Sequence, residues 1–586
     1  MTFFRQYHAL FISLFFIAVC FLLYSNTIGH QFVYDDFFYV TRPELRNWHY
    51  LPKLFWESHL TNNLSASGYR PLLIATIGLN FVLFGESPVS FHIANILVHA
   101  AMVCMAYFFT RYLFGGRLLP FVTALLFAFF PIHTENVAYV KARDDMLGAI
   151  FMLGSIWAVL HAARGKRPNI RPLVAGWILY ALAMLTKELT AVAPIIAVFL
   201  AWQRGTLMVK NRRDVMRILI ILSGFVAVFT GIAIIRIAIF GKWAFNTNDV
   251  FYIWNPLITA SFVTRALTVG KIFFWYAAKT IAPVGLSASY AYNHFPIVTS
   301  PLADGLSLVG WGALILMSFV CLWPKTRNSP IGLGACLFLL PTVILLKIFY
   351  QASDIFAERW MYFPSLGIAL IGGYFATRSI RRFKWVGIGV LLLLLTWYAS
   401  VLIPRNRVWE TRRTLAESIV RDAPDSVQGY YMLAVVNFNE GHIEEAKKLA
   451  KKSYDIYQEY PPVTYLLGRI SYHENQYDDA RRWFGTTITL SPTVSAPHKY
   501  YALMLTKLGR YQESLDHVRE QFLRNPTDKQ LRLIVGINYF ELGDIAAARQ
   551  ILPAEVFTGE ATRKQGLLTF PLDSWREQLI DEARRD

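Results

Sequence analysis

Two adjacent carboxylates, Asp35 and Asp36, lie in the segment HQFVYDDFFYV (30–40), shortly after the first long apolar stretch of the chain. Charged side chains close to a membrane are costly to keep and are commonly functional. A carboxylate in such a position can act as a general base that removes the proton of an attacking hydroxyl. Because a solvated acidic loop would look the same in isolation, the interpretation depends on the other loops predicted on this side.

The segment PIHTENVAYVKARDDML (131–147) places a cluster of ionisable residues at the mouth of an apolar stretch. One of its two aspartates could serve only to cap the next helix. Capping requires a single carboxylate, so the remaining charges are candidates for chemistry: His133, Glu135, Arg143, Asp144 and Asp145.

Further cations lie beside aromatic or acidic residues at the ends of apolar stretches: Arg70 in GYRPL, Lys187 with Glu188 in LTKEL, and Arg359 with Glu358 in FAERWMYFPS, where Tyr362 follows. The planar fork of arginine suits phosphate oxygens. Simple ion pairs, Lys187 with Glu188 and Arg359 with Glu358, are the competing explanation. Together, these groups are the set that a phosphate leaving group and a deprotonated nucleophile require.

The composition identifies an integral membrane protein, because 55% of the 586 residues are hydrophobic and 15% are aromatic. The formal net charge of +18 does not indicate nucleic acid, since most Lys and Arg before residue 405 form short clusters between apolar stretches. No P-loop, GxGxxG, GxSxG, CxxC or zinc-binding HxxxH pattern occurs. A nucleotide-binding enzyme is therefore unsupported.

Eleven apolar stretches are long enough to be predicted as spans, while 255–282 is assigned to the interface or a re-entrant segment. The first is read as a retained transmembrane helix rather than a signal peptide. With a cytoplasmic N-terminus, the basic clusters all fall on the inner side and the acidic loops on the outer side. The predicted spans are 9–25, 89–112, 118–132, 145–163, 172–186, 188–203, 216–240, 304–323, 331–349, 361–377 and 385–403.

Residues after 404 contain a repeat of 34 residues, typical of tetratricopeptide helix pairs. Small residues recur at two positions where paired helices touch, and a turn residue recurs between them. The repeated positions are Ala434, Gly468, Ala502 and Gly536; Ala446, Ala480, Ser514 and Ala548; and Gly441, Asn475, Gly509 and Gly543.

The sequence thus predicts an all-α protein: a polytopic transmembrane bundle of about eleven spans over 1–404, and a tetratricopeptide solenoid of about four repeats over 405–586 on the non-cytoplasmic side. Such repeats commonly bind an extended polypeptide, although a purely structural role is the alternative.

The chain resembles the transmembrane and tetratricopeptide-repeat O-mannosyltransferases, members of the GT-C class of polytopic glycosyltransferases. The motifs that carry the resemblance are collinear along the chain: FVYDD, YRPLLIATIGLNFVLFG, FHIANILVHA, LLFAFFPIHTENVAYVKARDDMLGAIF, LTKEL, PVGLSASYAYNHFP, AERWMYFPSLG and RNRVWE. The chain departs from the family pattern in three places. Its repeat array is short, and TKE replaces SKE. RDD stands where Arg-x-Asp is expected, so Asp144 is the extra residue.

The resemblance implies a sugar donor on a polyprenyl or dolichyl phosphate and an acceptor hydroxyl on the outer side. It implies an inverting displacement in which Asp35, or else Asp36, is the base. The donor phosphate would be bound by Arg359, Arg70, Lys187 and Arg143, and the substrates would be oriented by Asp145, His133, Glu135, Glu188, Glu358 and Tyr362.

No cofactor is certain, and a divalent metal, Mg²⁺ or Mn²⁺, is an open alternative through Asp35, Glu135 and Asp145. The expected partners are the lipid-linked sugar, a protein acceptor and the bilayer. A bacterial inner membrane is favoured over the endoplasmic reticulum, where the Asn63-Leu64-Ser65 sequon would be usable.

Three other functions are weighed against this one. A membrane-anchored repeat scaffold would not need the outer carboxylates, and a lipid-linked sugar translocator would line its path with polar residues that the mid-span regions lack. Transfer to a glycan or lipid acceptor would use the same membrane chemistry.

Overall fold

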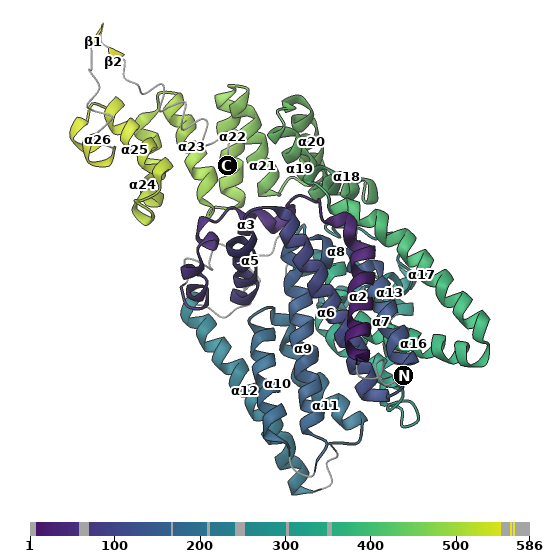
Figure 1. Cartoon of the computed structure of the whole chain (residues 1–586). Helices are drawn as coiled ribbons and strands as arrows, with labels where there is room; N and C mark the ends of the chain where they lie inside the picture. The colour runs from purple at the N-terminus through teal and green to yellow at the C-terminus, as the bar shows by residue number, and fades with distance from the viewer. Residues whose placement is uncertain are drawn as a thin grey trace. The chain divides into compact units, whose positions relative to one another are not determined.

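The computed structural model describes residues 7–57, 69–165, 168–207, 211–240, 252–300, 304–348 and 354–552, and a short antiparallel pair of strands, β1 (Arg563–Lys564) and β2 (Leu567–Leu568). The Asn63-Leu64-Ser65 sequon lies outside these residues. Cα proximity divides the chain into a membrane unit, Met1–Ser426, and a repeat unit, Val427–Asp586. Apart from that strand pair, regular structure in the described residues is helical, which confirms the predicted all-α class (Figure 1).

Each of the eleven predicted spans coincides with a helix of the membrane unit. One more apolar helix, α5, was not predicted as a span. The α-helices of this unit are α2 (His8–Tyr24), α3 (Phe37–Val40), α5 (Pro71–Phe84), α6 (Pro88–Phe114), α7 (Leu118–Phe129), α8 (Thr134–Ala138), α9 (Arg143–Ala162), α10 (Ile170–Met184), α11 (Ala193–Gln203), α12 (Arg212–Phe240), α13 (Phe262–Ile281), α14 (Gly305–Leu322), α15 (Pro330–Leu345), α16 (Ser365–Arg382), α17 (Lys384–Asn406) and α18 (Arg412–Asp422).

Within the described residues, six helices are long and apolar enough to cross a membrane, and the pair α7 and Pro131–Ala138, bent by 54°, would make a seventh. Four shorter apolar helices, α5, α10, Glu188–Gln203 and α15, accompany them. The chain is an integral membrane protein, and eleven crossings remain a prediction. Helix α13 lies in the stretch predicted for the interface and is not among these candidates.

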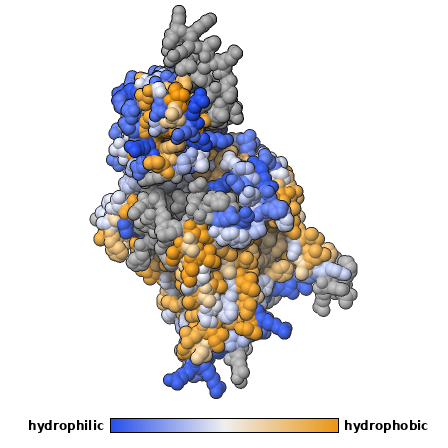
Figure 2. Space-filling model, turned by 90° about the vertical axis from the view of Figure 1, so that its left-hand side faces the viewer, coloured by the Kyte–Doolittle hydropathy of each residue, from blue (hydrophilic) through white to orange (hydrophobic). Residues whose placement is uncertain are grey.

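The spans differ in how they meet their surroundings. In the most apolar 18-residue segments of α6 and α9, 61% of the residues are buried. The corresponding share is only 11% in α12 and 17% in α14. Helices α6 and α9 therefore form the centre of the bundle, and α12 and α14 present apolar side chains outward, as lipid contact requires. On the face drawn in Figure 2, hydrophobic side chains cover the sides of the helical bundle.

Helices α15 and α16 touch backbone to backbone at two glycines. A Cβ on Gly367 would lie 2.2 Å from the Gly334 carbonyl oxygen, and a Cβ on Gly334 would lie 2.6 Å from that of Gly367. The 3₁₀ helix η11 (Glu358–Met361), which carries Arg359, ends shortly before α16. The close crossing therefore fixes the position of η11.

The repeat unit consists of helix pairs at the predicted positions. All the recurring turn residues have left-handed backbone, with φ of 84° at Gly441, 59° at Asn475, 74° at Gly509 and 84° at Gly543. A Cβ on Gly468 would meet the Phe484 ring at 2.6 Å, so this small residue is required for close packing. The pairs are α19 (Val427–Asn439) with α20 (Ile443–Ile456), α21 (Pro461–His473) with α22 (Tyr477–Leu490), α23 (Ser495–Lys507) with α24 (Tyr511–Arg524), and α25 (Lys529–Glu541) with α26 (Ile545–Ile551).

We expect Gly367→Val to separate α15 from α16 and to lower the stability of the purified protein by about 1–3 kcal/mol, the usual cost of overpacking. Gly389→Val in α17 is the matched control, because a Cβ at Gly389 meets nothing within 4 Å. Thermal unfolding in detergent measures both. Equal losses in the two variants would show that the crossing is not the cause.

Candidate active site

The two outer-loop aspartates have different environments. The Asp36 side chain is buried, with 1% exposure. Its Oδ2 accepts a hydrogen bond from the Val33 N–H at 3.1 Å, and its Oδ1 accepts one from the Lys141 N–H at 2.8 Å. Asp36 therefore joins the 3₁₀ helix η2 (Tyr34–Asp36) to η7 (Val140–Ala142).

Asp35 is fixed by its backbone and leaves its carboxylate available. Its N–H donates to the Tyr139 hydroxyl at 3.1 Å. In the part of the chain that the structure describes, the half-buried Asp35 carboxylate has no hydrogen bond or ion pair. The preceding residue, Tyr34, has φ of 53°, a left-handed conformation that a non-glycine residue adopts at a cost. Of the two carboxylates, that of Asp35 is therefore the more available.

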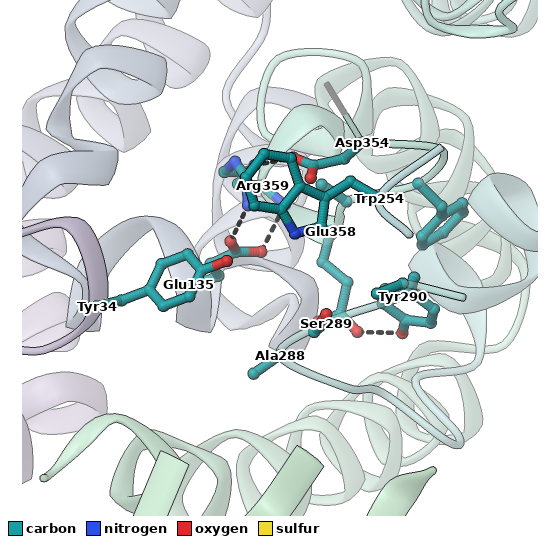
Figure 3. Close-up of a pocket in the computed structure, with 12 residues that line it drawn as sticks. Tyr34, Glu135, Trp254, Ala288, Ser289, Tyr290, Asp354, Glu358 and Arg359 are labelled. Carbon is teal, nitrogen blue, oxygen red and sulfur yellow. Dashed lines mark hydrogen bonds and ion pairs between the residues drawn. The ribbon is translucent and has the colours of Figure 1, made fainter. Parts of the chain in front are cut away.

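Arg359 forms two short ion pairs on the same loop surface (Figure 3). Its Nη1 lies 2.6 Å from Glu135 Oε1, and its Nη2 lies 2.6 Å from Asp354 Oδ2. The Arg359 N–H also donates to Glu135 Oε2 at 3.1 Å. Although burial alone would lower it, the carboxylates of Glu135 and Asp354 hold the pKa of Arg359 well above its ordinary value.

These groups line a polar pocket with about 350 Å³ of empty space, which includes open solvent. Tyr34, directly before Asp35, lies on one side of it, and Trp254 and Ser289 lie on another (Figure 3). The pocket therefore brings together segments that are far apart in sequence, from the first outer loop to η11. Its size and polar lining suit a hydroxyl-bearing substrate.

A second charged cluster surrounds the start of α9. Asp144 accepts from Arg70 Nη1 at 2.7 Å and lies 3.4 Å from Lys187 Nζ. Lys187 also pairs with Asp145 Oδ1 at 2.5 Å. Glu188 pairs with Arg70 at 3.1 Å and with Arg236 at 3.2 Å. Lys187 and Glu188 thus have other partners, and the alternative that they pair with each other is wrong.

A second pocket, with about 430 Å³ of empty space and largely apolar residues, adjoins this cluster. Asp145 and Lys187 are its charged lining residues, and Met152, Leu345 and Trp360 are among its apolar ones. The buried Oδ2 of Asp145 has no hydrogen-bond partner in the described residues. Asp145 and Lys187 therefore give this largely apolar pocket a cation and an available carboxylate oxygen.

Glu358 is bound away from Arg359. Its side chain is fully buried and accepts from Arg405 Nη2 at 2.7 Å, from the Ser287 N–H at 2.8 Å and from the Tyr290 hydroxyl. Burial raises the pKa of Glu358, and Arg405 opposes this shift. The alternative that Arg359 pairs with Glu358 is therefore wrong, and Glu358 is placed as a structural ion-pair partner.

Three other predicted residues have mainly internal contacts. Arg143 donates to Asn95 and Asn80 side chains at 2.7 Å each and to two backbone carbonyls. His133 Nε2 lies 2.7 Å from Ser365 Oγ, in an aromatic cluster with Tyr362. Tyr362 also lines the apolar pocket. Arg143 and His133 are thus oriented by the core, and only Tyr362 reaches a pocket.

The carboxylates considered for a metal are poorly arranged for one. Glu135 is paired with Arg359, and Asp145 with Lys187. Among the described residues, no three His, Cys, Asp or Glu side chains form a group that could hold an ion. The donor set therefore does not fit the open alternative of Mg²⁺ or Mn²⁺, and no catalytic step is assigned to a metal.

Sequence reasoning missed several members of the site: Tyr139, Lys141, Asp354, Arg236 and Arg405. Tyr139 and Lys141 lie inside the predicted 131–147 cluster, so their proximity to it was a usable signal. Asp354 lies only five residues before its partner Arg359, and Arg405 lies in the RNRVWE motif, whereas the partners of Arg236 and Arg405 are on distant segments of the chain.

These features define a polytopic membrane protein with a charged site and a tetratricopeptide repeat unit. Residues 70–230 match the family model described as Dolichyl-phosphate-mannose-protein mannosyltransferase. The chain is 24% identical over 526 residues to mouse Protein O-mannosyl-transferase TMTC3, covering 83% of this chain and 55% of that one. It is 27% identical over 489 residues to mouse Protein O-mannosyl-transferase TMTC4, covering 73% and 64%.

The chain is thus similar to the transmembrane and tetratricopeptide-repeat protein O-mannosyltransferases, in agreement with the resemblance seen in its motifs. It spans between 51% and 64% of the length of these curated relatives. Among solved structures, the crystal structure of the yeast Tom70 aligns with 82% of this chain at 12% identity and a TM-score of 0.23, too low to bear on the fold.

Asp36 provides a test through pH. Burial raises its pKa from 3.8 to about 7, so the folded state holds the proton more tightly than the unfolded state. Its contribution to stability is therefore fully present below about pH 4 and is lost as the pH rises to about 7. We expect Asp36→Asn to remove this dependence, measured as melting temperature against pH. A wild type and variant with parallel profiles would contradict the assignment.

Arg405→Met should destabilise the protein by about 3–5 kcal/mol, because it leaves the buried Glu358 charge unpaired. The double variant Arg405→Met with Glu358→Gln is the control and should recover much of the loss. Chemical unfolding of the detergent-solubilised protein measures the cycle. Additive losses would show that the two side chains act independently.

Proposed function

We propose that the chain transfers a sugar, a mannose-like hexose, from a polyprenyl-phosphate donor to a Ser or Thr hydroxyl of a protein. The observation that carries the proposal is the available Asp35 carboxylate, together with the cations Arg70 and Arg359 held in ion pairs and an apolar pocket lined by Lys187 and Asp145. The names of the relatives, protein O-mannosyl-transferases, agree with this chemistry.

The reaction is an inverting in-line displacement. Asp35 takes the proton of the acceptor hydroxyl as its oxygen forms a bond to the anomeric carbon of the sugar. The bond from that carbon to the phosphate oxygen breaks, and its electron pair leaves with the polyprenyl phosphate. No covalent intermediate with the protein is needed, so a single base is sufficient.

The charged groups have separate roles in this scheme. Asp36 holds the loop that carries Asp35. Lys187, which lines the apolar pocket, and Arg70, which shares Asp144 with it, stabilise the phosphate, and Arg359 faces the polar pocket where the acceptor enters. Asp145 accepts a sugar hydroxyl through its unpartnered oxygen.

The repeats bind the acceptor polypeptide, as solenoids of stacked helix pairs commonly do. The outer loops then face the periplasm of a bacterial inner membrane, with the lumen of the endoplasmic reticulum as the alternative compartment. In both cases the donor tail remains in the bilayer and the reaction takes place at its outer surface.

Transfer from radiolabelled polyprenyl-phosphate sugars to a membrane extract tests the proposal. We expect Asp35→Asn to reduce transfer by about 10²–10⁴-fold, the usual contribution of a general base. Glu44→Gln, in the same outer loop, is the matched control and should retain activity.

The labelled product distinguishes the remaining alternatives. Label in protease-sensitive material supports a protein acceptor, and label in a glycan or lipid fraction replaces that acceptor while keeping the enzyme. A folded wild type that transfers no sugar from any donor, together with normal function of Asp35→Asn in cells, would favour the membrane-anchored scaffold.

A further inference from the structure

Lys141 is tied through its backbone to the loop that carries the base. It lies in η7 between Tyr139 and Arg143, and its own N–H donates to Asp36 at 2.8 Å. The Tyr139 hydroxyl accepts from the Asp35 N–H at 3.1 Å. Two hydrogen bonds thus fix the backbone of Lys141 next to Asp35.

Lys141 differs from the other cations of the site in its contacts. Arg70, Lys187, Arg236 and Arg359 each lie within 3.4 Å of at least one carboxylate oxygen. Over the described ranges, the half-buried Lys141 side chain has no ion pair and donates no hydrogen bond. It is therefore the ammonium group that can bind an anion without first breaking an internal salt bridge.

The charges around Lys141 come from both halves of the site. Asp144 and Asp35 attract its ammonium group, while Arg70 and Arg359 repel it. A cation with two cationic neighbours is costly to hold unless anions balance the group. Asp35 is one of these anions, and the proposed reaction neutralises it.

We propose that Lys141 binds the phosphate of the donor and stabilises the leaving polyprenyl phosphate. This inference rests on the proposed function and adds to it a residue that neither the sequence motifs nor the relatives assigned.

The charge balance of the reaction explains why a lysine suits this position. The donor is a phosphodiester with one negative charge, and the leaving monoester gains one more. At the same time, Asp35 becomes neutral as it takes the acceptor proton. The negative charge near Lys141 therefore moves from the carboxylate to the phosphate, and a flexible ammonium on a four-carbon chain can follow it.

The experiment compares the binding of a polyprenyl phosphate and of the uncharged polyprenol of equal length to wild type, Lys141→Met and Lys141→Arg in nanodiscs. We expect Lys141→Met to lose about 10- to 100-fold in affinity for the phosphate, the value of a charge-assisted hydrogen bond, and to bind the polyprenol unchanged. Lys141→Arg should keep most of the phosphate affinity. Lys53→Met, at an outer lysine paired with Glu57, is the matched control.

The outcomes separate this inference from the proposed function. A wild type that binds neither lipid overturns the lipid-phosphate donor itself. A wild type that prefers the phosphate, with Lys141→Met equally selective, overturns only the role of Lys141. If Lys141→Met does not fold, Lys141→Arg provides the test. A folded Lys141→Arg variant that no longer prefers the polyprenyl phosphate over the polyprenol would contradict recognition of the phosphate by the charge at this position. Equal losses in Lys141→Met and Lys53→Met would also contradict the inference.

Discussion

The site depends on the pairing of buried carboxylates with guanidinium and ammonium groups. At the outer end of α9, Asp144 joins Arg70 to Lys187, and Glu188 joins Arg70 to Arg236. An unpaired charge there would be strongly destabilising, so each pair fixes two helices or loops at once. The outer loops are thus positioned by electrostatics where they lack the regular hydrogen bonds of the spans.

The same constraint separates structural from available groups. Asp36 has both oxygens bound by backbone N–H groups, and Glu358 is bound by Arg405, Ser287 and Tyr290. The Asp35 carboxylate, in contrast, has no such donor in the described residues. Chemistry is therefore best assigned to the groups that the internal pairing leaves unsatisfied, since these can bind substrate without loss of an existing interaction.

The two pockets differ in polarity, as do the two substrates of the proposed reaction. The polar pocket beside Arg359 contains hydroxyl and carboxylate groups, and the apolar pocket has hydrophobic lining residues together with Asp145 and Lys187. A lipid-linked sugar and a polypeptide hydroxyl differ in the same way. Residues of α9, which begins with the RDD motif, line the apolar pocket, and Glu135 of α8 lines the polar one.

The sequence by itself determined the elements: apolar stretches predicted the helices, and the spacing of 34 residues predicted the repeat pairs and the turn positions at Gly441 and Asn475. Helical periodicity and turn chemistry are local, so they can be read from neighbouring residues. Only the tertiary structure decided that Asp36 accepts a hydrogen bond from the Lys141 N–H, that Arg359 pairs with Asp354, and that Glu358 pairs with Arg405. Those choices depend on which distant charges share a low-dielectric site, and no local pattern encodes that geometry.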